Sequence, residues 1–130
     1  MDKKFFVPFE TAQQLREKGY PQELAVWYYH KTADEFAFVH SRYVPERVVK
    51  GQLTELGVWY TAAPTYHEVL YWLEWKGIYI TCYAPMLKPV GRYAISVFNS
   101  NTNDWGLCRG IYPTREEALN AGILAALKMI

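Results

Sequence analysis

The chain has almost no excess charge and no long hydrophobic run. Its 130 residues carry 14 basic and 13 acidic side chains, so the net charge is +1, and both signs are mixed along the sequence. Such a chain lacks the positive field that holds nucleic acid without regard to sequence. No apolar run approaches the roughly 20 residues of a membrane span. We therefore expect neither non-specific nucleic-acid binding nor a membrane segment.

Cysteine is also scarce, and the N-terminus lacks the features of a signal peptide. The apolar run near the start, Phe5–Val7, is far shorter than the hydrophobic region of a signal peptide. The two cysteines, Cys82 and Cys108, fall within predicted strands rather than in a spaced disulfide framework, which is typical of reduced, buried thiols. We expect a soluble cytoplasmic protein.

Aromatic residues are abundant. Eleven Tyr, six Phe and five Trp make up 17% of the chain, and the hydrophobic fraction is 51%. A chain of this size and hydrophobicity buries enough apolar surface to fold around one core. We therefore expect residues 1–130 to form a single domain.

Three segments have the start and stop signals of helices. The first runs from Phe9 to Lys18, between a proline that suits a first turn and a glycine that suits the residue after a helix. The other two each open with a capping box, in which threonine is followed three residues later by glutamate. The boxes pair Thr65 with Glu68 and Thr114 with Glu117, and the helices run to about Gly77 and Lys128.

Alternating apolar residues predict two hairpins and two shorter strands. The hairpins comprise residues 24–31 with 36–42 and residues 78–84 with 92–99, and the short strands lie at 57–60 and 107–111. Helices interspersed with hairpins favour an α+β fold with an antiparallel sheet packed by three helices. The predicted order is α-β-β-α-β-β-β-α. Because proline, helix, glycine and hairpin occur twice in that order, the pattern is consistent with two helix-hairpin half-repeats followed by a C-terminal helix.

The segments "FVPFETAQQLREKGY", "AAPTYHEVLYWLEWKGIYI" and "YPTREEALNAGILAALKMI", with the strand "AVWYYHK", carry a family resemblance. The chain resembles short uncharacterised proteins encoded by bacteriophages and mobile elements of gut Bacteroidetes, over nearly its whole length. Pro8 departs from the hydroxyl residue more usual there. The resemblance implies an accessory protein acting inside a bacterial host cell. It implies no catalytic residues.

Motifs for metals fail on their spacing. His67 and Glu68 begin like the zinc-protease helix, but Tyr71 stands where the second histidine is required. The asparagine-rich segment 99–110 has calcium-type oxygen ligands, yet Asp104 replaces the required glycine and a glycine replaces the final glutamate. A hairpin turn explains that segment better. We expect no metal and no other cofactor.

No catalytic motif is recognisable either. There is no glycine-rich phosphate loop and no serine in a nucleophile elbow. Cys82 alternates with Ile78 and Ile80 on the apolar side of its strand, where a thiol stays protonated and unreactive. We therefore assign no catalytic residue, although a site assembled only by folding leaves an enzyme of unrecognised class open.

The aromatic residues divide by face. The helical period puts Tyr66, Val69, Leu70 and Leu73 on one buried stripe, with Tyr71 and Trp75 outside it. Strand alternation places Ile78, Ile80, Tyr93, Ile95 and Val97 inside and Tyr79, Thr81, Tyr83, Arg92 and Ser96 on the opposite face. The predicted binding residues are Tyr71, Trp75, Tyr79, Tyr83, Arg92 and Arg109.

Three functions remain open from the sequence. The first is a non-enzymatic binding protein of a phage or mobile element, including one that modulates a host protein or a defence pathway. Its partner is a host protein or a second copy of the chain. The second is capture of a nucleotide-like molecule by aromatic stacking and arginine. The third is the enzyme of unrecognised class.

Overall fold

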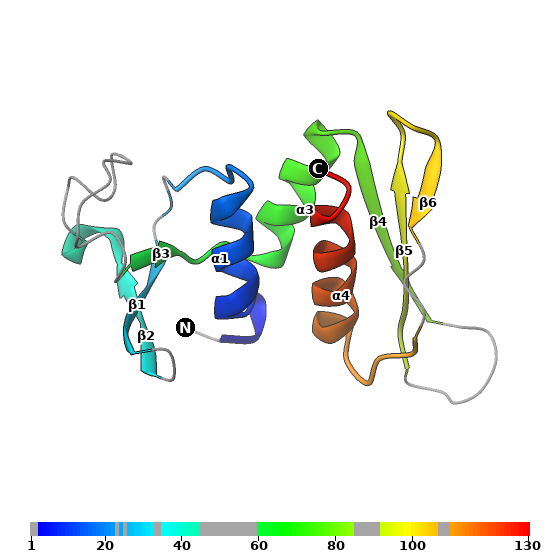
Figure 1. Cartoon of the computed structure of the whole chain (residues 1–130). Coiled ribbons are helices and arrows are strands. Elements are labelled where there is room, and N and C mark those ends of the chain that lie inside the picture. The colour runs from blue at the N-terminus through cyan, green and yellow to red at the C-terminus, as the bar shows by residue number, and fades with distance from the viewer. Residues whose placement is uncertain are drawn as a thin grey trace. The chain divides into compact units, whose positions relative to one another are not determined.

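The computed structural model describes residues 3–22, 24, 26–32, 35–44, 60–84, 92–106 and 110–130 (Figure 1). The contacts divide the chain into two compact units. The N-terminal unit is Phe6–Pro64, and the C-terminal unit combines Met1–Phe5 with Thr65–Ile130. The predicted α+β class and element order are confirmed, with the hairpins in two separate three-stranded antiparallel sheets.

The described part of the N-terminal unit contains one α-helix, a short 3-10 helix and one sheet. Its elements are α1 (Phe9–Glu17), β1 (Val26–Thr32), β2 (Glu35–His40), the 3-10 helix η2 (Ser41–Tyr43) and β3 (Tyr60–Ala62), and the strand order is β2-β1-β3. Pro8 precedes α1 with φ −59°, an angle that suits a helix start. Gly19 follows it with φ +87°, the left-handed conformation that glycine adopts without strain.

The core of the N-terminal unit includes side chains from both faces of β1. Trp27 and Tyr28 are neighbours in the chain and therefore point to opposite faces, yet both are buried. The ring of Tyr28 stacks on Phe38 with 4.8 Å between centroids, and its hydroxyl donates to the carbonyl of Val7. The Trp27 indole donates to the carbonyl of Leu24 at 2.9 Å. Both polar tips are thus satisfied inside the unit.

Among the residues described for the C-terminal unit, two α-helices pack against one sheet. Its elements are the 3-10 helix η1 (Lys3–Phe5), α3 (Tyr66–Trp75), β4 (Ile78–Tyr83), β5 (Ala94–Asn99), β6 (Asp104–Gly106) and α4 (Arg115–Leu127). The strand order is β4-β5-β6, and all neighbours are antiparallel. Helix α4 contacts β4 and β5, while α3 contacts β4 and α4 (Figure 1). The core includes Val69, Leu73, Ile78, Ile95, Val97 and Ile123.

Local signals located the helices of both units well. The capping box of Thr65 and Glu68 is present in full, and the Thr114 hydroxyl accepts from the Glu117 backbone N–H at 3.1 Å. Leu119, Ile123 and Leu127, which recur every four residues along α4, are all buried. Helix boundaries are therefore set here by interactions within one or two turns of the chain.

Two short strands lie elsewhere than predicted. Strand β3 begins at Tyr60, whereas the prediction ended there, and residues 57–59 lie outside the described part of the chain. Strand β6 is Asp104–Gly106, within a segment assigned to a loop, while the predicted strand 107–111 lies partly outside the described residues. Asn103 has φ +60° and ends the turn early, so pairing with β5 starts at Asp104. Strand β6 is short and polar, so the sequence has no alternation of apolar residues that predicts it.

Each unit has a helix followed by a glycine with positive φ, a hairpin and a short third strand. The third strand differs in its partner, because β3 pairs with the first strand of its hairpin and β6 with the second. The half-repeat and single-domain hypotheses stay predictions.

Candidate functional site

Aromatic side chains occupy the face of the β4-β5-β6 sheet that points away from the buried positions. Along β4, Ile78 is buried, whereas Tyr79 and Tyr83 are exposed. The antiparallel register places Phe98 of β5 opposite Tyr79 and Trp105 of β6 opposite Phe98. Side chains directly opposite in adjacent strands share a face of the sheet. We call Tyr79, Tyr83, Phe98 and Trp105 the aromatic face.

The rings of the aromatic face form a row across all three strands. Phe98 and Trp105 contact one another with 4.8 Å between centroids and planes tilted by 40°. Trp105 is 66% exposed, so the row is open to solvent at its β6 end. The sequence prediction included Tyr79 and Tyr83 but missed the other two. Alternation beyond Ser96 could have identified Phe98, whereas Trp105 was assigned to a loop.

A second group of exposed aromatic residues lies on α3. Tyr66, Val69 and Leu73 of the predicted stripe are buried and Leu70 is half-buried. Tyr71 and Trp75 lie outside the stripe, and Trp75 is 77% exposed. Their rings meet edge to face with 6.3 Å between centroids, and with Glu74 they line an open hollow of about 300 Å³. The predicted division of this helix into a core side and an exposed side is confirmed.

Of the two predicted arginines, Arg92 lies in the described part of the chain. Arg92 is exposed, two residues before β5 begins. Arg109 lies outside the described residues. One basic group is therefore placed beside the hairpin that carries Tyr79 and Tyr83.

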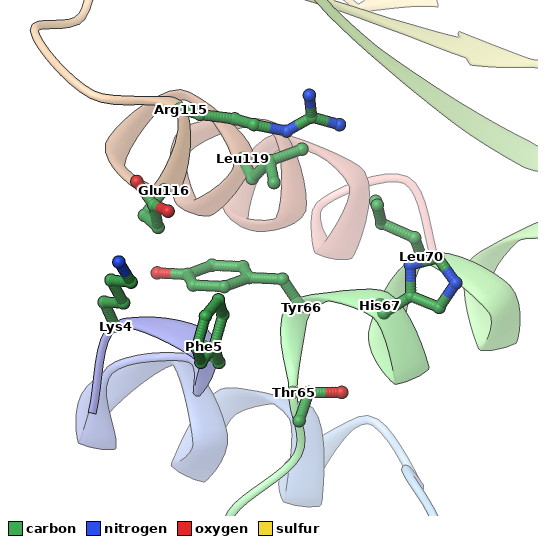
Figure 2. A pocket seen from close by; sticks show the side chains of 9 residues that line it. All are labelled: Lys4, Phe5, Thr65, Tyr66, His67, Leu70, Arg115, Glu116 and Leu119. Carbon is green, nitrogen blue, oxygen red and sulfur yellow. The ribbon is translucent and has the colours of Figure 1, made fainter. Parts of the chain in front are cut away.

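A cavity of about 430 Å³ lies where α3 and α4 begin, beside η1 (Figure 2). It is lined by Lys4, Phe5, Thr65, Tyr66, His67, Leu70, Arg115, Glu116 and Leu119, all within the C-terminal unit. Tyr66 is only 8% exposed, and its hydroxyl points toward Lys4 and Glu116. Burial, and then the charges of Glu116 and Glu117, raise the pKa of Tyr66 to about 12. Sequence reasoning assigned Tyr66 to the core and had no signal for the cavity.

Cys82 is a half-buried free thiol on β4. Burial raises its pKa, Arg115 acts in the opposite direction, and Glu116 raises it further. A thiol whose pKa is raised remains protonated at neutral pH and is a poor nucleophile. Its position agrees with the structural role expected from alternation. Cys108 lies outside the described residues.

Within the described ranges, no three or more His, Cys, Asp or Glu side chains cluster in a way that could hold a metal ion. None of the described helices has the length and apolar character needed to cross a membrane.

No protein-family model matches the chain, and it matches neither a curated protein nor a solved structure. The resemblance to proteins of phages and mobile elements therefore stays a prediction.

Proposed function

We propose that this protein is a non-enzymatic binding protein that holds a partner protein on its aromatic face. In the setting that the family resemblance implies, the partner is a protein of the bacterial host, including one of a defence pathway, and binding takes place in the cytoplasm. The observation that carries the proposal is the row Tyr79, Phe98 and Trp105, which crosses three strands and remains open to solvent.

Exposed aromatic rings on a rigid sheet suit protein recognition. Tyr and Trp are enriched among the residues that dominate binding energy at protein interfaces, because each buries a large area at a small cost in side-chain entropy. Ladder hydrogen bonds and the packing of α4 hold the strands beneath the rings in place. Little reorganisation would therefore oppose binding.

The test begins with capture of partners from a bacterial host lysate by the tagged full chain. A partner identified there is then titrated against purified wild type, Trp105→Ser and Tyr79→Ser. We expect both substitutions to weaken binding by at least tenfold, because each removes a ring from the row. Tyr43→Ser is the matched control, because Tyr43 is an exposed tyrosine of the N-terminal unit. Unchanged affinity in both sheet variants would contradict the proposal.

A nucleotide-like molecule is a second candidate for the same face. The tilted Phe98 and Trp105 rings offer a stacking surface for a base, and the exposed Arg92 precedes the strand that carries Phe98. Mass spectrometry of small molecules released from the purified protein separates this candidate from the first. A stoichiometric nucleotide that is lost in Trp105→Ser would favour it.

A further inference from the structure

Strand β4 forms one edge of the C-terminal sheet within the described part of the chain. The strand order is β4-β5-β6, so β4 has a neighbouring strand on one side only (Figure 1). The outer side of an edge strand presents a row of backbone N–H and C=O groups that can pair with another strand. The outer side of β4 is therefore a candidate interaction surface.

The hydrogen-bond pattern determines which residues of β4 face outward. The Ser100 N–H donates to the Gly77 carbonyl at 2.8 Å, in register with the pairs between β4 and β5. Backbone groups of successive strand residues alternate in direction. Thr81 therefore directs its N–H and C=O toward β5, whereas Ile80 and Cys82 direct theirs toward the edge. No hydrogen bond joins these outward groups to another residue that the structure describes.

Strand β4 lacks the features with which proteins usually block an edge strand. Those features are charged side chains, proline, a β-bulge or a very short strand. The sequence of β4 is IYITCY, and its six residues pair with β5 without a register shift. In contrast, β6 at the opposite edge of the sheet has three residues and begins with Asp104. Strand β4 is thus the better suited of the two edges for pairing with another strand.

The residues of β4 are suited to pairing with a second copy of the same strand. In an antiparallel pair centred on Thr81, Ile80 lies opposite Cys82 of the second copy, and these two residues exchange two backbone hydrogen bonds. Twofold symmetry repeats this pair on the other side of Thr81. The same register places Tyr79 opposite Tyr83 of the second copy. Aromatic pairs and threonine pairs directly opposite one another stabilise a sheet, and β4 has no charge that would repel its copy.

We propose that two copies of this chain pair antiparallel along β4, around a twofold axis at Thr81. The two three-stranded sheets then form one continuous sheet, with the aromatic faces of both copies on the same side. Tyr79 and Tyr83 are 46% and 48% exposed, so pairing buries aromatic surface that is open in a single copy. The proposal goes beyond the function proposed for the aromatic face, because it concerns the edge of the sheet and is tested without a host protein.

Sedimentation of the purified full chain over a range of concentrations measures the oligomeric mass. We expect a reversible dimer in the wild type. Thr81→Lys should raise the dissociation constant of the dimer at least tenfold, because the twofold axis brings two lysine ammonium groups together. Thr102→Lys is the matched control and should leave the constant unchanged, since Thr102 is an exposed threonine in the turn between β5 and β6.

Two results of this measurement would overturn the proposal. One is a wild type that stays monomeric at millimolar concentration, and the other is a dimer that Thr81→Lys leaves intact. Thr81 is exposed, so the lysine variant should keep the circular dichroism spectrum of the wild type.

A disulfide tests the register of the pair. In a background with Cys82→Ser and Cys108→Ser, Thr81→Cys supplies the only thiol of the chain. Residues directly opposite one another have Cβ atoms about 4.5 to 5.5 Å apart, close to the distance that a disulfide spans. We expect Thr81→Cys to form a covalent dimer under mild oxidation at least tenfold faster than Thr102→Cys in the same background. Equal rates in the two variants would show that Thr81 does not lie opposite its copy and would overturn the proposal.

Discussion

Gly122 of α4 lies so close to Ile95 of β5 that a β-carbon added at Gly122 would come within 2.8 Å of the Ile95 Cγ1 atom. The same β-carbon would come within 2.9 Å of the Ile80 Cγ2 atom. Glycine therefore allows α4 to pack closely on β4 and β5. This contact gives the sheet one helix-covered face and leaves the aromatic face on the other.

Gly122→Ala should destabilise the protein, although alanine is the better helix former. Helix propensity favours alanine by about 1 kcal/mol. Against this, the new methyl group overlaps two β-branched side chains that have little rotamer freedom, and overpacking costs about 1 to 3 kcal/mol. The difference is a net loss of up to about 2 kcal/mol in the free energy of unfolding, measured by urea unfolding.

The adjacent half-buried Ala121 supplies the matched comparison. Ala121→Gly should lower the free energy of unfolding by about 1 kcal/mol through helix propensity alone. If helix propensity alone governed both positions, Gly122→Ala would stabilise the protein. That result would show that α4 can move away from the sheet at little cost.

Leu73→Ala and Trp75→Ala should separate the core side of α3 from its exposed side. Leu73 is fully buried, and its truncation should cost about 2 to 5 kcal/mol. Trp75 is 77% exposed and meets the ring of Tyr71 edge to face, so its truncation should cost less than about 1 kcal/mol.

Melting temperature and oligomeric mass, measured together, check this pair. If Trp75→Ala instead unfolds a protein that is monomeric throughout, Trp75 belongs to the core. A loss of self-association in Trp75→Ala without a loss of stability would identify the exposed side of α3 as a contact between copies.

Tyr66 should make stability fall at alkaline pH. Its pKa is about 12 in the folded protein, whereas a tyrosine ordinarily has a pKa of 10.0. Between these values the unfolded chain therefore releases the proton first. This group leaves stability unchanged below pH 10. Stability decreases as pH rises from 10 toward 12, and the total loss is at most about 2 to 3 kcal/mol.

Urea unfolding of wild type and Tyr66→Phe at a series of alkaline pH values measures this effect. The phenylalanine variant should lose less stability over the same pH range. Parallel curves for the two proteins would mean that the folded-state pKa of Tyr66 is not raised.

Thr65→Ala should weaken the beginning of α3. The Thr65 hydroxyl accepts from the Glu68 N–H at 3.2 Å, and the Glu68 carboxylate accepts from the Thr65 backbone N–H at 3.0 Å. Loss of such a cap costs about 1 kcal/mol. Thr65→Ser keeps the hydroxyl and should retain most of the stability in urea unfolding. An equal loss in both variants would assign the effect to the methyl group of Thr65 rather than to the cap.

The sequence by itself was sufficient for features that depend on neighbours along the chain. The capping box of Thr65 and Glu68, the end of α1 near Gly19 and the division of α3 between Leu73 and Trp75 were all predicted. Each follows from hydrogen bonds or side-chain directions within about two turns of a helix. Alternation likewise assigned Ile78 and Tyr79 to opposite faces of β4.

Only the tertiary structure decided which distant segments meet. The row from Tyr79 through Phe98 to Trp105 depends on pairing between three strands, and its last member follows a turn that ends at Asn103 with positive φ. The cavity joins Lys4 to Glu116 around a buried tyrosine, and these residues come from opposite ends of the chain. Side-chain periodicity specifies which face of an element is buried, whereas register and packing between elements specify what lies opposite that face.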